Sequence, residues 1–474
     1  MSSRQREETA QTTAGLDEAP PLAVMFVANP FVYDTRVEKQ AQTLLDWGFR
    51  VRVLCRADAS LPALETRRGV QIERLGLRRR DFVTALVFAL FPPPGFLARA
   101  FLRRPNRTPT VGLKSAPSAV LAKSGPSRFK WQRLVTRWLP PSAPRLSFCI
   151  GFARRAATEP ADVVVSHDLD TLLAGVLLSR AFGTPLLYDS HELFVERNVG
   201  VSPRWKERLF WGRLERRLIR RADRVTTVAE GIATELAETY GIERPALIRN
   251  VQRYQEPIGE SSALRRKIGV AESKRLVIYA GALTFNRGLE QLIEASAFLA
   301  EDAAFVVMGY AHDPEYLKGL LKRARDRGTL GTSVFFTEAV PSEDVARYVA
   351  GAALGIVPTQ AICRSYEYEA SNKIFHCVMA GVPLAMSDHS EKRALVAEWD
   401  IGVLFDEKDP SEIARVVNVL LANEPRRRDL AENCLTAART LNWDHEELRY
   451  RDLIQRLVPD LRLRPVAEVG AVSA

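Results

Sequence analysis

The segment Tyr366–Asp406 constrains the fold of this 474-residue chain more than any other part of its sequence. A short helix is predicted over Asn372–Ala380, because Gly381 can end it and Pro383 prevents it from continuing. A buried strand is predicted next, over Pro383–Ser387, and a second helix and strand follow before the segment ends. Helices and buried strands that alternate in this way predict an α/β fold with a parallel sheet.

The start of this predicted helix is suited to bind an anion. Free backbone N–H groups and the positive end of the helix dipole lie where the chain carries Asn372 and Lys373. Two carboxylates, Glu367 and Glu369, come just before the helix and could hold the hydroxyls of a sugar or ribose. The sequence therefore predicts a phosphate and sugar site here, although an ordinary α/β unit with solvated charges would show the same pattern.

Strand, helix and strand also alternate near the N-terminus, over Leu22–Ala28, Thr35–Trp47 and Arg50–Cys55. Such a βαβ unit is right-handed and places the loop after its first strand at the carboxyl end of the sheet, where α/β proteins bind ligands. Asp34 and Arg36 lie in or beside this loop, which makes them candidate substrate ligands. The alternative is a helix cap followed by an exposed arginine.

Two histidines are each predicted to follow the end of a buried strand. His167 and Asp168 come after the strand Ala161–Ser166, and His191 comes shortly after the strand Leu186–Asp189. Both histidines therefore face the ligand-binding edge of one parallel sheet. A single histidine is more often structural, but two at matching strand ends favour a functional site.

These elements resemble the retaining glycosyltransferases of family 4, whose members have the GT-B fold. The most specific part of the match is made by Asn372-Lys373-Ile374-Phe375, Ala380-Gly381-Val382-Pro383 and Ser387-Asp388. Other elements that resemble the family are His167-Asp168, Asp189-Ser190-His191-Glu192 and the weaker D-x-R-V element that begins at Asp34. The basic segment 78–155 falls outside the resemblance.

Three positions depart from the family pattern. His376 stands where a second glutamate is usual, and Tyr368 stands eight residues before it, where the first glutamate would lie. In the loop from Gly281 to Gly288, the family uses two cations to hold the donor diphosphate. Ala282 replaces the first of them, and Arg287 can stand for the second because its planar fork suits phosphate.

The resemblance implies an α/β protein of the GT-B fold, with two Rossmann-like parallel-sheet domains that face each other across a cleft. Residues 21–250 are expected to form the acceptor-side domain, and residues 255–440 the domain that binds the nucleotide sugar. Residues 441–474 are expected to form a helix that crosses back to the first domain, and a tail. Residues 1–20 are polar and lack the apolar core of a signal peptide, so we expect a disordered tail there.

By the same resemblance, the reaction is transfer of a sugar from a nucleotide diphosphate donor to an acceptor hydroxyl, with retention and without a metal or other cofactor. A lipid-linked or cell-surface glycan precursor is the expected acceptor. A sugar-nucleotide epimerase of the same fold and a relative that only binds sugar nucleotides are the alternatives. His167 and His191 are the candidate catalytic residues, and the candidate substrate-binding residues are Asp34, Arg36, Asp168, Gly281, Arg287, Glu367, Glu369, Asn372, Lys373 and His376.

The net charge of +10 is concentrated in residues 78–155. This segment holds 16 Lys or Arg and one Asp, which gives +15, so the rest of the chain carries −5. Its apolar runs, such as Phe82–Phe91, are shorter than the ~20 residues that span a bilayer, yet they place Phe and Trp beside Arg. We expect an insertion that contacts an anionic membrane peripherally. A helical hairpin packed on the sheet is the alternative.

Other partners are constrained by motifs that the sequence lacks. There is no helix-turn-helix pattern, RNP-like strand or zinc spacing, so we expect no nucleic-acid partner. The five cysteines lie far apart and are predicted to be reduced, mostly buried thiols. We therefore expect a cytoplasmic protein, with peripheral contact to the inner face of the cell membrane.

Overall fold

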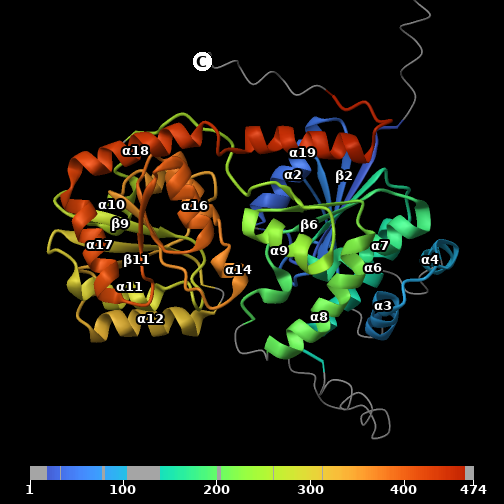
Figure 1. Ribbon diagram of the computed structural model, residues 1–474, viewed down its shortest axis with the longest axis horizontal. Coiled ribbons are helices and arrows are strands. Elements are labelled where there is room, and N and C mark those ends of the chain that lie inside the picture. Colours follow the sequence, from blue (N-terminus) through green and yellow to red (C-terminus); the bar gives the residue numbers. More distant parts are fainter. Residues whose placement is uncertain are drawn as a thin grey trace, which may run out of the picture.

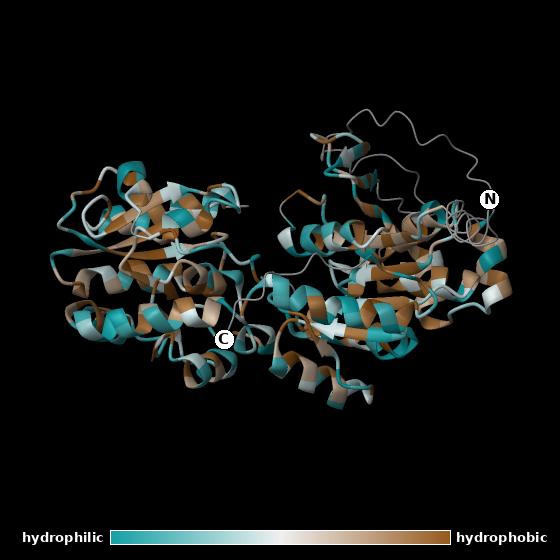
Figure 2. Ribbon diagram, turned by 90° about the horizontal axis from the view of Figure 1, so that it is seen from above, coloured by the Kyte–Doolittle hydropathy of each residue, from teal (hydrophilic) through white to brown (hydrophobic). Residues whose placement is uncertain are grey.

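The computed structural model describes residues 19–464, except 33, 77–80, 104–138, 200–203, 260 and 312. These residues form two α/β domains that lie side by side, each built around one central sheet (Figure 1). The strands are hydrophobic and lie inside both domains, while polar residues are frequent on the helices around them (Figure 2). The predictions for residues 1–18 and for the middle of the basic segment lie outside the described residues.

The N-terminal domain holds an eight-stranded sheet in the order β3-β4-β2-β1-β5-β6-β7-β8. Neighbouring strands are parallel, except that β3 runs antiparallel to β4. The strands are β1 (Leu22–Val27), β2 (Arg50–Arg56), β3 (Leu64–Arg67), β4 (Val70–Leu75), β5 (Val163–His167), β6 (Leu186–Ser190), β7 (Arg224–Thr227) and β8 (Ala246–Leu247). The helices are α2 (Thr35–Asp46), α3 (Asp81–Leu90), α4 (Gly95–Leu102), α6 (Phe148–Ala156), α7 (Leu169–Phe182), α8 (Arg204–Leu218) and α9 (Glu230–Tyr240).

The C-terminal domain holds a six-stranded parallel sheet in the order β11-β10-β9-β12-β13-β14. Its strands are β9 (Arg275–Ala280), β10 (Ala303–Gly309), β11 (Val334–Glu338), β12 (Leu354–Val357), β13 (Leu384–Ser387) and β14 (Gly402–Phe405). Its helices are α10 (Ala263–Ile268), α11 (Leu289–Ala295), α12 (Pro314–Asp326), α13 (Val345–Val349), α14 (Arg364–Glu367), α15 (Asn372–Met379), α16 (Ser390–Trp399), α17 (Pro410–Ala422) and α18 (Glu424–Ala438).

The strand order reverses once in each sheet, between β1 and β5 and between β9 and β12. At such a reversal the loops after the two strands diverge and leave a crevice at their carboxyl ends, where α/β proteins bind ligands. The predicted site residues lie at or near these two places.

The basic segment is only partly an addition to the fold. α6 begins within it, yet α6 is the helix that leads into β5 and is buried along most of its length. The ring of Phe152 stacks on Phe26 of β1 at 5.9 Å, so α6 covers the sheet as an ordinary crossover helix. α3 and α4 bury small residues, among them Ala85, Ala89 and Ala98, and α4 packs along α7.

The last helix, α19 (Trp443–Leu457), crosses back to the N-terminal domain as predicted (Figure 1). Its Trp443 is fully buried and donates from Nε1 to Oγ1 of Thr43 at 3.1 Å. The ring of Tyr450 packs on Trp47 with centroids 5.7 Å apart. α19 is therefore part of the core of the N-terminal domain, although it follows the C-terminal domain in sequence.

The state of the cysteines and the length of the apolar helices can be checked over the whole of the described chain. All five cysteines are buried and free, which confirms the prediction of buried thiols. Among the described residues, no helix is both long and apolar enough to cross a membrane.

Candidate active site

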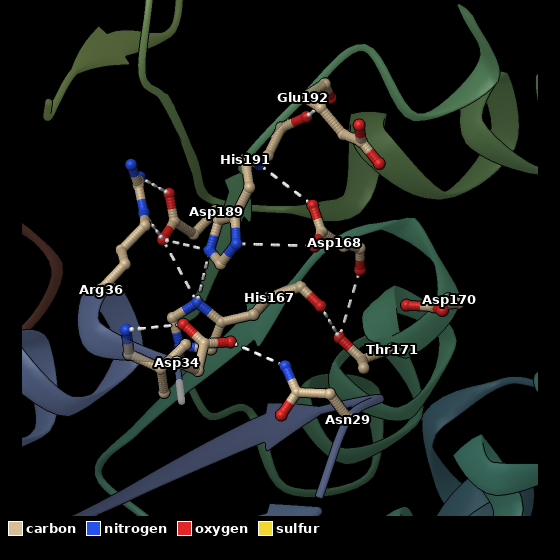
Figure 3. A network of polar contacts seen from close by, with 12 residues as sticks. Asn29, Asp34, Arg36, His167, Asp168, Asp170, Thr171, Asp189, His191 and Glu192 are labelled. Carbon is tan, nitrogen blue, oxygen red and sulfur yellow. Dashed lines mark hydrogen bonds and ion pairs between the residues drawn. The ribbon is translucent and has the colours of Figure 1, made fainter. Parts of the chain in front are cut away.

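A cluster of histidine and aspartate side chains lies at the carboxyl ends of β5 and β6 (Figure 3). His167 ends β5, and the parallel pairing of the two strands sets it opposite Asp189 of β6. The Nδ1 atom of His167 lies 3.2 Å from Oδ2 of Asp189 and 3.1 Å from Nε2 of His191. The structure therefore brings the two predicted histidines into contact. We call Arg36, His167, Asp189 and His191 the histidine cluster.

Asp189 is the centre of the histidine cluster. Its fully buried carboxylate accepts hydrogen bonds from Arg36 Nε at 2.9 Å, Gln40 Nε2 at 2.8 Å and Thr226 Oγ1 at 2.8 Å. Burial alone would raise the pKa of Asp189, but Arg36 and the two histidines hold it well below its ordinary value. Asp189 is therefore ionised. Sequence reasoning placed Asp189 in an element that resembles the family but did not select it as a site residue, because it ends a buried strand.

Asp34 ends the predicted loop and Arg36 lies in the first turn of α2, but Arg36 does not point to a ligand. It is only 2% exposed, and its guanidinium donates to both oxygens of Asp189 and, from Nη1, to the carbonyl of Ile248 at 2.9 Å. The substrate contact predicted for Arg36 is replaced by a buried ion pair. Asp34 caps α2 with one oxygen and accepts from Nδ2 of Asn29 at 2.7 Å with the other, at the border of the cluster.

The two histidines differ in charge. Burial opposes protonation of His191, but the carboxylates of Asp168 and Asp189 outweigh it and raise its pKa to about 9. Burial lowers the pKa of His167 below its ordinary value. Nδ1 of His167 lies within hydrogen-bond distance of both the ionised Asp189 and Nε2 of His191, so the nitrogen that carries the proton of a neutral His167 depends on its tautomer. Nε2 of His167 is buried and has no hydrogen-bond partner among the described residues, so it can pair with a ligand hydroxyl as donor or as acceptor.

Asp168 holds a strained backbone beside the histidine cluster. Its φ of 61° and ψ of 162° fall in a region that is almost exclusive to glycine. Its backbone N–H donates to the carbonyl of Asp189 at 3.0 Å, and its Oδ1 accepts from the backbone N–H of His191 at 3.0 Å. Strain of this kind costs about 1–3 kcal/mol and is common at functional sites. Asp168 therefore fixes the position of His191.

The spacing of His167, Asp189 and His191 would also suit a metal ion, since one ligand atom from each lies within 4.8 Å of the others. However, Arg36 already balances the charge of Asp189, and a cation placed there would meet that guanidinium. We therefore describe the group as a hydrogen-bonded cluster. The expectation that the protein needs no metal stays a prediction.

A second group of predicted residues lies near the carboxyl ends of β9 and β12. Oε1 of Glu369 accepts from Nη1 of Arg287 and lies 3.4 Å from Nζ of Lys373. The guanidinium of Arg287 also lies over the ring of Tyr366, at 4.4 Å from its centroid. Lys373 runs close to Gly281, where a Cβ atom would lie only 3.1 Å from Cδ of the lysine. Gly281 therefore serves by leaving room for this lysine.

Lys392 of α16 adds a third cation to this group. It is fully buried, and burial lowers its pKa to about 8, while Glu369 opposes that effect more strongly than Glu407 does. Burial also lowers the pKa of Lys373 to about 8. Burial would raise the pKa of Glu369, but the three cations hold it well below its ordinary value. We call Arg287, Lys373, Lys392 and Glu369 the cationic cluster.

The cationic cluster has more positive than negative charge in a place that is poorly solvated. A buried cation without a partner is costly, so such an excess suits an anionic ligand. Sequence reasoning missed Lys392, because a lysine in the first turn of a helix is usually solvated. Only the fold shows that this turn starts at the carboxyl end of β13 and is covered.

Two predicted ligands have other partners in the structure. Oε1 of Glu367 accepts from the backbone N–H of Ser390 at 3.1 Å, so this carboxylate caps the start of α16. His376 is half-buried and neutral, since desolvation lowers its pKa to about 3. Its Nε2 lies 3.3 Å from Nε2 of Gln252, in the segment that joins the domains. Asn372 begins α15 as predicted.

The histidine cluster and the cationic cluster border the same domain junction. From the N-terminal domain, Nδ2 of Asn198 lies 3.2 Å from Oη of Tyr366, the residue on which Arg287 stacks. The same Nδ2 lies 3.4 Å from the carbonyl oxygen of Phe285, which precedes Arg287 by two residues. Arg287 is also among the charges that lower the pKa of Glu192, the neighbour of His191.

Comparison with protein families assigns both halves of the chain. Residues 122–250 match the glycosyl transferase 4-like domain, and residues 260–435 match the glycosyl transferases group 1. The chain belongs to the group 1 glycosyltransferases. The first match begins at residue 122, inside the basic segment 78–155. The similarity of this glycosyltransferase to its family therefore includes part of the segment that the sequence pattern placed outside the resemblance.

Individual relatives of this glycosyltransferase are distant. A D-inositol 3-phosphate glycosyltransferase of Xylanimonas cellulosilytica is 25% identical over 300 residues, which cover 60% of this chain and 69% of the relative. An alpha-maltose-1-phosphate synthase of Mycolicibacterium smegmatis is 24% identical over 316 residues, covering 60% and 77%.

Solved structures confirm the GT-B fold of this glycosyltransferase. The sucrose-phosphate synthase from Thermosynechococcus elongatus matches with a TM-score of 0.69 and 16% identity, over 93% of this chain and 100% of that chain. The Anabaena protein HepE, in complex with UDP-glucose, matches with a TM-score of 0.63 and 14% identity, over 92% and 99%. At these identities the likeness concerns the fold alone.

Proposed function

We propose that this glycosyltransferase moves a sugar from a nucleotide diphosphate donor to an acceptor hydroxyl, with retention of configuration. The cationic cluster is the observation that carries the proposal, because its excess of buried positive charge fits a diphosphate. The complex of the structural neighbour HepE with UDP-glucose supports the same kind of donor. The C-terminal domain would hold this donor at the crevice between β9 and β12.

The leaving group of such a reaction is a nucleoside diphosphate, so negative charge grows on its phosphate oxygens. Arg287 and Lys373, together with the free backbone N–H groups at the start of α15, would stabilise that charge. Because these groups are already in place, no metal ion is needed to neutralise the diphosphate.

The reacting sugar would lie between the two clusters. Its ring gains oxocarbenium character as the diphosphate leaves. The unpartnered Nε2 of His167 would form a hydrogen bond with a hydroxyl of this sugar. Oε2 of Glu369 is also buried without a partner among the described residues, and it would accept from a hydroxyl on the other side. We assign no residue of the chain as a covalent nucleophile.

The acceptor is proposed to be a lipid-linked or cell-surface glycan precursor, reached at the inner face of the cell membrane. α3 and α4 support membrane contact because they bury only narrow stripes and expose large apolar side chains. Phe91, which directly follows α3, is 73% exposed, and Phe96 of α4 is 72% exposed. Val83, Val87 and Leu97 are also exposed on these helices, and Arg99 and Arg103 lie over the ring of Phe182 nearby. Apolar and cationic side chains together fit an anionic interface.

The donor site is tested by Lys373→Ala and Arg287→Ala. Each should weaken UDP binding by roughly ten- to hundredfold, because a charged hydrogen bond is worth about 1.5–3 kcal/mol. The matched controls are Lys318→Ala and Arg415→Ala, which remove exposed cations of the same domain. Isothermal calorimetry with UDP measures the affinity, and circular dichroism checks the fold. Unchanged UDP affinity in both cluster variants would refute the donor-site assignment.

A further inference from the structure

The start of α9 is held by a side chain of the other domain. α9 begins after Ala229, whose side chain cannot cap the free backbone N–H groups of the first turn. Oε1 of Glu391, in α16 of the C-terminal domain, accepts from the backbone N–H of Gly231 at 2.5 Å. A carboxylate at a helix N-terminus also interacts favourably with the helix dipole. The C-terminal domain therefore supplies a cap for α9.

Tyr368 packs on the same turn of α9. A Cβ atom on Gly231 would lie only 2.7 Å from Cγ of the tyrosine ring and closer still to its Cδ1, so the ring rests directly on the backbone of α9. Tyr368 belongs to the C-terminal domain, yet it packs against the hydrophobic core of the N-terminal domain. Tyr368 is one of the positions that depart from the family pattern, and this contact gives it a role.

Arg364 joins Tyr368 to the next turn of α9. Its Nη2 lies 2.6 Å from Oε2 of Glu235, one turn after Gly231, and 3.3 Å from Oη of Tyr368. The guanidinium is half exposed, so the ion pair mainly orients the tyrosine. We call Arg364, Tyr368 and Glu391 the α9 clamp.

The α9 clamp lies between the two clusters of the site. On the donor side, Tyr366 and Glu369 come within two residues of Tyr368, and both contact Arg287 of the cationic cluster. On the other side, α9 follows β7, which donates a hydrogen bond to Asp189 of the histidine cluster. A shift at the α9 clamp would therefore change the distance between the two clusters.

Other contacts across the junction are of a different kind. Asn198 and Arg204 of the N-terminal domain reach Tyr366 and the carbonyl of Ile362, through hydrogen bonds that are at least partly exposed. Water can replace such hydrogen bonds when two surfaces separate. The ring of Tyr368 would instead lose an apolar contact that water does not replace. Tyr368 is therefore the member of the junction whose loss should matter most.

We propose that the α9 clamp fixes the separation between the cationic cluster and the histidine cluster, with Tyr368 as the positioning residue. The inference rests on the proposed transfer function, because that function assigns both clusters to one reaction. Reacting atoms must be held about 3–3.5 Å apart, and a displacement of about 1 Å can lower a rate about a hundredfold. The α9 clamp itself touches neither the diphosphate nor the sugar, so UDP binding does not need it.

The experiment measures the distance between the domains by pulsed electron paramagnetic resonance. Nitroxide labels are attached to Arg213→Cys in α8 and Lys318→Cys in α12, at exposed positions on the side of the molecule opposite α19 (Figure 1). The five native cysteines are buried, so the introduced cysteines take the labels. The labelled protein should give one narrow distance distribution. Tyr368→Ala should add a population at longer distance, because the domains can then separate.

Gly231→Ala tests the same contact from the side of α9. The added methyl group would displace the ring of Tyr368, so this variant should add the same longer distance. Combined with Tyr368→Ala it should have no further effect, because the ring is already gone. The matched controls are Gly151→Ala in α6, where a methyl group meets no other atom, and Tyr348→Ala in α13. Both controls should keep the narrow distribution.

UDP affinity keeps this inference apart from the proposed function. Calorimetry on the labelled proteins should give dissociation constants for UDP within about threefold of one another. If the protein without clamp substitutions does not bind UDP, the proposed function is wrong. If UDP binds normally and Tyr368→Ala and Gly231→Ala both keep the narrow distribution, only the α9 clamp is refuted. A loss of UDP affinity of about tenfold or more in Tyr368→Ala would make this residue a donor ligand and overturn its positioning role.

Discussion

Asp189→Asn should destabilise the N-terminal domain strongly, although the two side chains have nearly the same shape. Asp189 is fully buried, and its negative charge is the partner of an Arg36 that is only 2% exposed. Asparagine would leave that guanidinium buried without a counterion and would turn one accepting oxygen into a donor.

The size of the effect follows from the burial of the pair. Removing one partner of a buried ion pair costs about 3–5 kcal/mol. For a domain of this size, 1 kcal/mol corresponds to about 2–4 °C in melting temperature, so the transition should fall by about 6–20 °C. Asp326→Asn is the matched control, because Asp326 is exposed and pairs only with Lys322 at the surface. It should shift the transition by about 2 °C or less.

Differential scanning calorimetry measures both variants, and a double-variant cycle tests the cause. Arg36→Gln removes the other partner, and the combination of Arg36→Gln with Asp189→Asn leaves no buried charge unpaired. The double variant should therefore be less destabilised than the sum of the two single variants. If the losses simply add, or if Asp189→Asn behaves like Asp326→Asn, the ion pair does not stabilise the histidine cluster as argued here.

Three further predictions concern catalysis, pH and the membrane. His167→Ala should lower kcat while donor KM stays near the wild-type value, since its contact is made mainly in the transition state. Steady-state kinetics measures this with His445→Ala as control, and a normal kcat in His167→Ala would mean that His167 is only structural. The pKa of His191 is raised from 6.5 to about 9, so its contribution to stability is fully present below about pH 6.5 and is lost as the pH rises through 9. Urea unfolding from pH 6 to 10 should show that the difference in free energy of unfolding between wild type and His191→Asn shrinks over that range, and a constant difference would contradict the prediction. The double variant Phe91→Asp with Phe96→Asp should reduce flotation with anionic liposomes, whereas Phe298→Asp, an exposed control in the C-terminal domain, should not. If wild-type protein does not float with these liposomes at low salt, the prediction of membrane contact is wrong.

The elements of the fold were predictable because each carries a local signal. The predicted helix at Asn372 and strand before Asp388 match α15 and β13 closely, since Gly381 and Pro383 fix the break between them. The histidines were predictable as partners because both follow strands of one parallel sheet, and the pairing of β5 with β6 sets His167 opposite Asp189.

Side-chain direction was not predictable from the same signals. Arg36 and Glu367 lie close to the expected loops, in α2 and α14, but Arg36 turns inward to Asp189 and Glu367 caps α16. The range 78–155 was treated as one insertion because it is uniformly basic, whereas α6 within it is a buried crossover helix. Charge along the sequence does not show which residues cover a sheet, because that depends on the strand order on either side.

The position of α19 has a consequence for the order in which the protein can fold during synthesis. Trp443 docks on Thr43, a residue made 400 positions earlier. At about 5–20 residues per second, translation needs roughly 20–80 s to cover that interval. During this time Trp47 and the neighbouring face of α2 lack the helix that finally covers them. The first domain to emerge from the ribosome is thus completed only after the second has been made.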